Sequence, residues 1–320
     1  MSEWSYSAAN IVPLKMLLDK DVLKSAKKGK IIPIHAQFMP TNKCNRNCKF
    51  CSCSKRDKNL EMDFEKSKKV IDGLKRLGCK AVTLTGGGEP SLYPKINELI
   101  NYFVKKKIKV GVVTNGTVFD KVSPYIFNKV TWCRISCSDY YDVDLDDLFD
   151  WINCFSKVDL SFSYVVSDKP DYGKIKKIVK FADWHGFTHI RFVSDILNPE
   201  KSKVKEVREY LRGELLDFKF IIYQDRRDFT RGDRFCYIGY LKPVISPDFK
   251  IYTCCGAQYA LDNPSRDVDD RFCIGNALDL KKVYEDNKPF NGAICSKCYY
   301  SDYNKLLGGM LQDIKHKEFV

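Results

Sequence analysis

Four cysteines stand within ten residues of this 320-residue chain, in the stretch CNRNCKFCSC from Cys44 to Cys53. Cys44, Cys48 and Cys51 follow the pattern C-x3-C-x2-C, and Cys53 lies out of step with it. Three thiolates suit three corners of a four-iron cluster and leave one iron open, whereas a fully ligated cluster takes four. The alternative is a zinc knuckle, which wants four closing ligands and would need Cys53 as the fourth. The spacing favours iron and sulfur over zinc.

The bulk composition sets the context for these thiols. Hydrophobic residues make up 44% of the chain, and no apolar run approaches the roughly 18 residues that a membrane span requires. The N-terminus lacks a basic start followed by an apolar block, so we expect no signal peptide and a cytoplasmic protein. In a reducing compartment the fourteen cysteines favour metal binding over structural disulfides. The four histidines are scattered, which argues against a histidine-rich metal site.

The net charge of +13 has two explanations. An anionic partner such as nucleic acid would account for it. Basic segments at 27–30 (KKGK) and 226–234 (RRDFTRGDR) support that view. However, most lysines fall on the polar faces of expected helices, as in 66–69 and 174–177, and a lysine-rich solvated surface would look the same. Charge alone leaves both explanations open.

The elements that must position the cysteines alternate along the chain. Strand-like and helix-like segments follow one another with short connections, which predicts parallel βα units. The expected strands cover 31–38, 80–85, 109–114, 131–136, 160–166 and 189–193. Six such units are too few for a closed eight-unit barrel and suit a partial one. Ligand sites in these folds lie at the carboxyl ends of the strands, and the cysteine loop follows the first strand there.

A second motif, TGGGEP from Thr85 to Pro90, follows the second strand. Glycines at a strand end let the backbone approach a ligand closely, and Glu89 can accept a hydrogen bond from an ammonium group. A lone GGG is also what an ordinary βα turn can contain. Placed one βα unit after C-x3-C-x2-C, it is far more specific.

Together these motifs resemble the radical S-adenosylmethionine (radical SAM) superfamily. The resemblance rests on CNRNCKFC, GGGEP, TNGT (114–117) and RISCSD (134–139), and it covers about residues 31–195. It implies a partial (β/α)6 TIM-like barrel. In that family the open iron of the cluster chelates the amino and carboxylate groups of the cofactor's methionine. Reductive cleavage then yields a 5′-deoxyadenosyl radical that abstracts hydrogen from a substrate.

Carried onto this sequence, the resemblance assigns roles to individual residues. Cys44, Cys48 and Cys51 become the cluster ligands, and Cys53 matches no ligand position. The residues expected at the cofactor are Gly87, Gly88 and Glu89 around the methionine amino group and Ser136 at the ribose. Asn115 is expected to support its turn rather than to touch substrate.

Six further cysteines lie between Cys236 and Cys298. Cys295 and Cys298 have metal-ligand spacing, and Cys236 and Cys254 flank a hairpin-like segment with a turn at 246–250 (SPDFK). These four thiolates suffice for a second [4Fe–4S] cluster, with a zinc ribbon as the alternative. The region resembles the SPASM/twitch extensions of radical SAM proteins. Because no cysteine follows Cys298, the shorter, twitch-like α+β form with one auxiliary cluster fits best.

Two assignments inside this region are choices between neighbours. Cys254 is preferred to Cys255 as a ligand, and Cys273 is read as structural. The remaining cysteines outside both sets are expected to be buried small apolar residues, namely Cys79, Cys133, Cys137 and Cys154. The expected organisation is an extension (1–30), the barrel (31–195), a connection (196–230), the twitch-like domain (231–302) and a terminal helix or tail (303–320).

The expected function is that of a radical SAM oxidoreductase. An auxiliary cluster would take an electron from the substrate radical in an oxidation or dehydrogenation, and a flavodoxin or ferredoxin would supply the first electron. Only about 30 residues precede the first strand, too few for a peptide-binding domain, so a small molecule or a nucleotide or nucleic acid is favoured over a peptide. Modification of a nucleic-acid base or of a peptide is the alternative. The catalytic acid or base stays open among Asp139, Asp195 and Arg191.

Overall fold

The computed structural model describes residues 12–154, 157–227, 229–262, 267–313 and 315. In this part of the chain a ten-stranded sheet runs in the order β10-β9-β8-β1-β2-β3-β4-β5-β6-β7. Seven consecutive strands of this sheet run parallel: β1 (His35–Phe38), β2 (Ala81–Leu84), β3 (Lys109–Thr114), β4 (Trp132–Ser138), β5 (Asp159–Val166), β6 (His189–Ser194) and β7 (Ile221–Gln224). The order does not return to its start, so the sheet is open.

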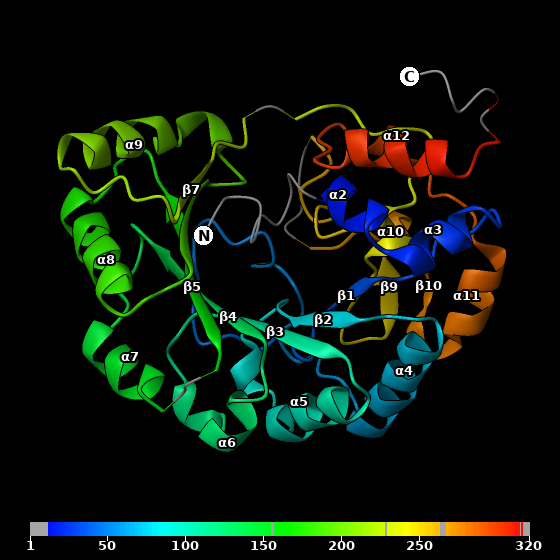
Figure 1. Ribbon diagram of the computed structural model, residues 1–320, viewed down its shortest axis with the longest axis horizontal. Helices are drawn as coiled ribbons and strands as arrows, with labels where there is room; N and C mark the ends of the chain where they lie inside the picture. Colours follow the sequence, from blue (N-terminus) through cyan, green and yellow to red (C-terminus); the bar gives the residue numbers. More distant parts are fainter. Residues whose placement is uncertain (1–11, 155–156, 228, 263–266, 314, 316–320) are drawn as a thin grey trace.

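Helices separate the strands and lie along one side of the sheet (Figure 1). They are α4 (Phe64–Arg76), α5 (Ile96–Lys105), α6 (Pro124–Phe127), α7 (Leu145–Ile152), α8 (Tyr172–Trp184) and α9 (Val204–Gly213). Each helix buries an apolar stripe, as in α8, where Ile175, Ile178 and Val179 face the core. Among the described residues this makes six strand–helix units, β1–α4 to β6–α9, and confirms the predicted α/β alternation with a parallel sheet.

The two faces of the sheet differ in chemistry. On the helix-covered outer face, residues such as Phe38, Leu84 and Ile135 are fully buried in one core cluster. The alternate residues of the same strands point to the opposite, inner face, and there the sequence is polar, with Thr83 and Arg134 as examples. A strand that is apolar on both faces would pack between two layers. These strands instead leave a polar inner face.

The C-terminal strands continue this same sheet. β8 (Val244–Ile245) pairs parallel to β1, and β9 (Lys250–Tyr252) and β10 (Cys273–Asn276) follow in antiparallel register. The expected hairpin turn is present, with Phe249 in the left-handed region at a φ of 63°. Sheet hydrogen bonds therefore cross the boundary that the sequence suggested near residue 231, because β8 pairs with β1.

The remaining helices close the C-terminal side. α11 (Leu280–Asp286) contacts α4, where a Cβ at Gly73 would lie 2.8 Å from Cδ1 of Leu280. α10 (Ile238–Leu241) and α12 (Ser301–Met310) flank the cysteine-rich segment, and α12 overlaps the start of the expected tail. Residues 314 and 316–320 of that tail lie outside the described residues.

The expected extension also contains structure that the sequence reading missed. Two short helices, α2 (Val12–Leu17) and α3 (Lys20–Ala26), precede β1. Asp19 caps α3 by accepting from the backbone N–H groups of Asp21 and Val22. Residues 1–11 lie outside the described part. Within the described ranges, no helix is long and apolar enough to cross a membrane.

Candidate active site

The first three candidate ligands lie on the loop that leaves the carboxyl end of β1. Cys44, Cys48 and Cys51 are all half-buried, and the backbone N–H of Cys51 donates to the Cys48 carbonyl at 3.0 Å. Burial raises the pKa of the Cys48 thiol, and the neighbouring Cys44 raises it further. A side-chain hydrogen bond that the Cys51 thiol donates to Cys53, and then burial, raise the pKa of Cys51. The loop thus gathers three thiols within electrostatic reach of one another.

The glycine-rich loop packs directly against the start of the cysteine loop. A Cβ built on Gly87 would lie 1.7 Å from Oδ1 of Asn42, and one on Gly88 would lie 2.0 Å from the Lys43 carbonyl oxygen. The backbone N–H of Glu89 donates to the same Lys43 carbonyl at 2.7 Å. The glycines were expected to admit a ligand. In the structure they first allow the two candidate loops to touch.

Glu89 is buried and its carboxylate joins two strand ends. Oε1 accepts from the backbone N–H of Ser91 at 3.1 Å, from its hydroxyl at 2.7 Å and from the Thr114 hydroxyl at 2.8 Å. Oε2 accepts from the Asn115 N–H at 2.7 Å. Burial raises the pKa of this carboxyl, while these hydrogen bonds oppose the rise. The contact with a ligand ammonium stays a prediction, and bracing the turn after β3 is a role that the sequence did not indicate.

The side chain of Asn115 connects the turn after β3 to the cysteine loop. Its Nδ2 lies 3.9 Å from the Cys44 sulfur and donates to Oδ1 of Asn45 at 2.8 Å. Its Oδ1 accepts from the backbone N–H and the hydroxyl of Thr117, at 3.1 and 2.6 Å. The expectation that Asn115 supports its turn is confirmed. The contact with Cys44 was missed, and its only sequence signal was the position of TNGT directly after a strand.

Ser136 lies on the inner face of β4, half-buried, opposite Ser163 of β5. The two acidic candidates for acid–base chemistry accept hydrogen bonds that hold nearby turns. Asp139 accepts from the Tyr164 hydroxyl at 2.6 Å and from two backbone N–H groups. Asp195 accepts from the residues of its own turn. Arg191 is on the inner face, two residues along the strand from His189.

The C-terminal candidates lie together. Cys236, Cys254, Cys295 and Cys298 all line one pocket between α10, the segment after β9 and the start of α12. Burial raises the pKa of Cys236 to about 11 and that of Cys295 to about 12, and the other thiols add to both effects. Their shared pocket brings four thiols from distant parts of the sequence to one place.

The surplus cysteines point elsewhere. The Cys255 sulfur lies 3.4 Å from the Tyr300 hydroxyl, and the Cys273 thiol donates to the Gly275 carbonyl; neither residue lines the four-cysteine pocket. This geometry favours Cys254 over Cys255. Three other cysteines are buried as expected, Cys79, Cys133 and Cys137. Cys154 is exposed instead, because it follows the end of α7.

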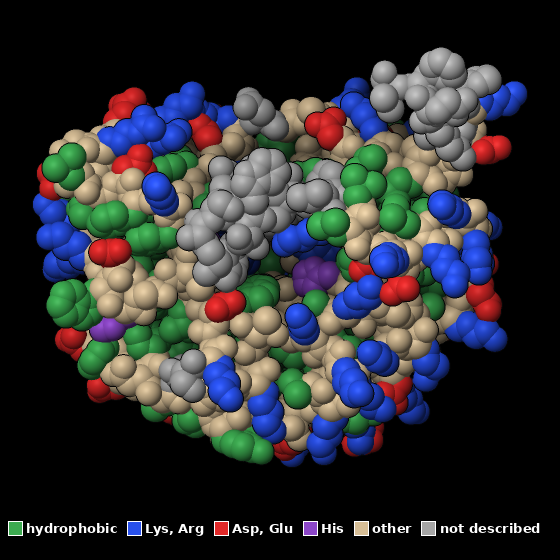
Figure 2. Space-filling model, in the orientation of Figure 1, with side chains coloured by type: hydrophobic (Ala, Val, Ile, Leu, Met, Phe, Trp, Pro, Cys, Tyr) green, Lys and Arg blue, Asp and Glu red, His purple; other side chains and the backbone are tan. Residues whose placement is uncertain are grey.

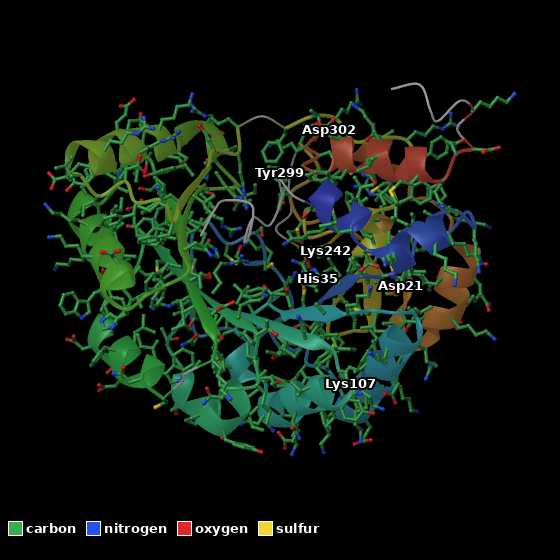
Figure 3. All side chains as sticks on the ribbon, in the orientation of Figure 1. Asp21, His35, Lys107, Lys242, Tyr299 and Asp302 are labelled. Atoms are coloured by element: carbon green, nitrogen blue, oxygen red, sulfur yellow. The ribbon has the colours of Figure 1, made fainter. Side chains whose placement is uncertain are left out.

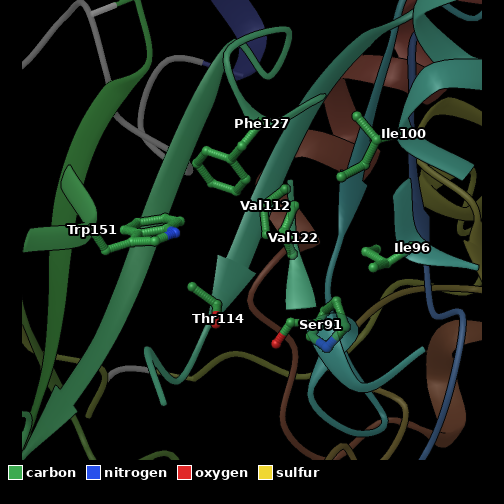
Figure 4. A pocket seen from close by; sticks show the side chains of 9 residues that line it. Ser91, Ile96, Ile100, Val112, Thr114, Val122, Phe127 and Trp151 are labelled. Carbon is green, nitrogen blue, oxygen red and sulfur yellow. The ribbon is translucent and has the colours of Figure 1, made fainter. Parts of the chain in front are cut away.

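A separate apolar pocket lies on the outer face of the sheet (Figure 4). Its lining includes Ile100, Val112, Phe127 and Trp151, with Thr114 and Ser91 at one end. Because the lining is almost wholly apolar and the helices cover it, this is a packing space. It bears on the site because Ser91 and Thr114, whose hydroxyl groups donate to Glu89, are part of its lining.

Comparison with known proteins now gives these motifs a family. Residues 38–136 match the radical SAM superfamily. This segment is a radical SAM domain. It contains the cysteine loop, the glycine-rich loop, Asn115 and Ser136, so the resemblance drawn from the motifs is confirmed at the level of the domain.

Several curated relatives share this part of the chain. The subtilosin biosynthesis protein AlbA of Bacillus subtilis (strain 168) is 31% identical over 129 residues, which is 38% of this chain and 29% of AlbA. Mycofactocin maturase MftC of Mycobacterium tuberculosis is 30% identical over 126 residues, 39% of this chain and 30% of MftC. The match therefore spans under a third of these relatives' length.

Solved structures extend the likeness of fold beyond the radical SAM domain. Streptococcus suis SuiB bound to S-adenosylmethionine has a TM-score of 0.61 at 18% identity, covering 88% of this chain and 72% of SuiB. The structure of anSMEcpe with bound AdoMet and a peptide has a TM-score of 0.56 at 14% identity, covering 90% of this chain and 86% of anSMEcpe. At these identities the comparison shows a shared fold.

The donor set of the first loop fits the [4Fe–4S] cluster that a radical SAM domain implies, and the second set has the thiols for a further one. No three His, Cys, Asp or Glu side chains among the described residues converge on a point for a single metal ion, but a four-iron cluster takes one thiolate at each iron. Three thiols on one loop and four in one pocket match an open and a closed cluster in number and type. Beside Gly87, the buried Oδ1 of Asn42 accepts no hydrogen bond from the described residues, so a polar acceptor faces the glycine-rich loop.

Cys53 connects the radical SAM domain to the C-terminal region. Its buried thiol donates to the Gly86 carbonyl at 3.4 Å and lies 3.6 Å from Nε2 of Gln258. Gln258 also accepts from Arg56. The Cys53 thiol thus lies between the glycine-rich loop and Gln258. That Cys53 does not bind the cluster remains a prediction.

We predict that Gly87→Ala unlocks the two loops. The added methyl cannot fit against Asn42, so the loops must separate, and we expect a loss of about 1–3 kcal/mol in the free energy of unfolding and less iron bound at Cys44. Urea unfolding and iron analysis measure both. Gly213→Ala is the matched control, because no atom lies within 4 Å of its Cβ position. Equal stability of the two variants would contradict the packing described above.

We also predict that Asn115→Ala shifts the potential of the first cluster. Hydrogen bonds to cluster sulfurs help to set reduction potentials, and a donor near Cys44 favours the more negative, reduced state. Its loss should make the midpoint potential more negative in a redox titration followed by electron paramagnetic resonance. Thr117→Val is the control, since it alters the same turn without a contact to Cys44. A potential equal to that of the wild type would remove Asn115 from this role.

Proposed function

We propose that this chain is a radical SAM enzyme in which a partial barrel holds the cofactor and a twitch-like C-terminal region holds an auxiliary cluster. The observation that carries the proposal is the chain of contacts from Glu89 through Asn115 to Cys44, inside the segment that matches the family. Bound there, a [4Fe–4S] cluster and S-adenosylmethionine would supply reductive cleavage of the cofactor and a hydrogen-abstracting radical.

The chain's own residues would divide the work as follows. Cys44, Cys48 and Cys51 hold the first cluster. Gly87 and Gly88 keep the glycine-rich loop against it, Glu89 holds the turn that carries Asn115, and Ser136 faces the inner space where the cofactor's ribose is expected. The inner face of the sheet binds the substrate.

The second part of the proposal concerns the four-cysteine pocket. Cys236, Cys254, Cys295 and Cys298 would hold a closed [4Fe–4S] cluster, since four thiolates leave no iron open. Their position beside the inner face suits an electron acceptor, so the overall reaction would be an oxidation. The substrate would lose a hydrogen atom, a proton and an electron, and a flavodoxin or ferredoxin would supply the electron for cofactor cleavage.

The substrate we propose is a peptide. AlbA is named for bacteriocin biosynthesis, MftC is named a maturase, and SuiB has been solved bound to the precursor peptide SuiA. These names favour the peptide alternative over the small molecule expected from the sequence. A nucleotide dehydratase of Selenomonas ruminantium is also similar, at 32% identity over 99 residues, so a nucleotide is the substrate against which the peptide must be tested.

Deuterium transfer tests the substrate class without knowledge of the substrate. The reconstituted, reduced protein is incubated with S-adenosylmethionine and one perdeuterated pool at a time: a peptide digest, a nucleotide mixture, a DNA duplex or a sugar mixture. We expect deuterium in 5′-deoxyadenosine only with peptides. Deuterium from nucleotides or DNA instead would overturn the peptide assignment and leave the radical chemistry intact. Cys44→Ala is the control that should give no deuterated product from any pool.

A further inference from the structure

The inner face of the sheet gathers basic side chains from strands far apart in the sequence. Arg134 on β4 is in register with Ser161 of β5, which is in register with His189 of β6. The next row in the same direction contains Ser136, Ser163 and Arg191. Register partners in a parallel sheet point to the same face, so both arginines lie on the inner face.

Two more cations complete this group, which we call the basic cluster: Arg134, Arg191, Arg226 and Lys242. Arg226 follows β7, and Lys242 precedes β8 by two residues. Figure 2 shows blue and purple side chains inside a hollow at the centre of the molecule, and Figure 3 places His35 and Lys242 in that area with Tyr299 nearby. All four members are half-buried, as residues lining an open interior would be.

No acidic side chain in the described part of the chain forms an ion pair with the basic cluster. Arg191 donates to the Ser163 hydroxyl at 3.0 Å, and the Arg226 guanidinium donates to Gln224 and lies 5.6 Å from the Tyr299 ring centre. The Nε atoms of Arg134, Arg191 and Arg226 are buried, and the described residues offer them no acceptor. The ion pairs of this protein instead involve residues such as Lys80 and Lys176 elsewhere.

The positive charges of the basic cluster lower one another's pKa values. Burial first, and then Arg226, lower the pKa of Arg134 to about 10. Burial, Arg134 and Arg226 lower the pKa of Arg191 well below its usual range. Burial, and then Arg134 and Arg191, lower the pKa of His189 to about 4. Arginine nevertheless keeps its charge in proteins. Like charges held together without a counter-ion destabilise the folded chain, so the cluster is unfavourable until an anion joins it.

The basic cluster lies between the two candidate cofactor sites. Arg191 shares a sheet row with Ser136, and Lys242 is within electrostatic reach of Cys254 and Cys255. A group bound among these cations would therefore sit beside both the expected ribose position and the four-cysteine pocket, where a substrate must be if it is to give hydrogen to one side and an electron to the other.

We propose that the basic cluster binds a carboxylate or phosphate group of the substrate, with Arg134 and Arg191 as its principal ligands. Planar guanidinium groups bind such oxyanions with paired hydrogen bonds. This inference rests on the proposed function, because only that function makes the bound anion part of a substrate. For a peptide the anion would be an acidic side chain or the terminal carboxylate, and for a nucleotide it would be phosphate.

Thermal stability distinguishes a binding site from a structural feature. We compare the reconstituted wild type with Arg191→Gln in chloride, in inorganic phosphate and in glutarate at equal ionic strength. Arg76→Gln is the matched control, because it removes an exposed arginine from α4 on the outer side. Both oxyanions should raise the Tm of the wild type and of Arg76→Gln through mass action. Arg191→Gln should start about 2–4 °C higher and lose most of the response.

The contrary results are equally defined. A lower Tm for Arg191→Gln with the anion response retained would make the arginine structural and overturn the proposal. A response that saturating S-adenosylmethionine removes would assign the anion to the cofactor's own carboxylate and also overturn it. A response to phosphate but not to glutarate would keep the anion site and exclude a peptide carboxylate.

A second measurement needs no variant. Phenylglyoxal labels accessible arginines, and peptide mass spectrometry reports each one. In wild-type protein, phosphate or glutarate should reduce labelling of Arg134 and Arg191 severalfold while leaving the exposed Arg76 and Arg231 unchanged. Equal protection at all four positions would contradict a specific site. Neither readout depends on cofactor cleavage, so a failure of the anion site and a failure of the radical chemistry would be told apart.

Discussion

Replacing Cys48 by alanine should lower the rate of 5′-deoxyadenosine formation at least about 1000-fold. Cleavage of the cofactor depends on the cluster that this thiol is expected to bind. Cys48 lies between Cys44 and Cys51 on the loop after β1, and two thiolates cannot hold a cluster that three should bind. The measurement is 5′-deoxyadenosine by mass spectrometry after anaerobic reconstitution and reduction, with the iron content of each preparation.

Two variants control this result. Cys154→Ala removes an exposed thiol that follows α7 and should behave as the wild type does. Cys53→Ser decides between iron–sulfur and zinc, because only the zinc alternative needs a fourth ligand on this loop. We expect Cys53→Ser to keep its cluster. Loss of the metal from Cys53→Ser together with bound zinc in the wild type would return the loop to the zinc interpretation.

The second large effect is expected at the four-cysteine pocket. Cys295→Ala should lower the iron content from about eight to about four atoms per chain, because a closed cluster needs its four thiolates. Cleavage of S-adenosylmethionine should continue, since Cys44, Cys48 and Cys51 are untouched, while oxidation of the substrate should stop. Iron analysis and 5′-deoxyadenosine formation are measured on the same sample.

The neighbouring cysteines supply the controls for the pocket. Cys255 approaches Tyr300 and Cys273 approaches Gly275, so Cys255→Ala and Cys273→Ala should keep about eight iron atoms. Cys254→Ala should behave as Cys295→Ala does. If Cys255→Ala lost the iron and Cys254→Ala kept it, Cys255 and not Cys254 would be the cluster ligand.

Much of the alternation of strands and helices was accessible from local sequence patterns. Apolar runs of strand length, alternating with amphipathic segments such as Ile175 to Ala182, predicted the six strands and five of the six following helices within a few residues. The short helix α6 was not predicted. The radical SAM domain was accessible because its motifs are local, with Cys44, Cys48 and Cys51 on one loop and Gly86 to Pro90 on another. Such signals need no knowledge of how distant segments meet.

The features that the sequence did not reveal all depend on pairing between distant segments. β8 joins β1 across about 200 residues of chain, so a boundary near residue 231 could be suggested but the continuous sheet could not. The Asn115 contact with Cys44 requires the turn after β3 to meet the loop after β1. The basic cluster depends on how β4, β5 and β6 pair. In the sequence alone, Arg134 and Arg191 are ordinary strand residues with no sign that they lie on the same face.

The most direct test of this account is the formation of 5′-deoxyadenosine by the anaerobically reconstituted, reduced protein given S-adenosylmethionine. We expect 5′-deoxyadenosine from the wild type above the level in unreduced samples, and none above that level from Cys48→Ala. A fully iron-loaded wild type that binds S-adenosylmethionine and forms no 5′-deoxyadenosine under reduction would contradict the assignment of radical chemistry to this chain.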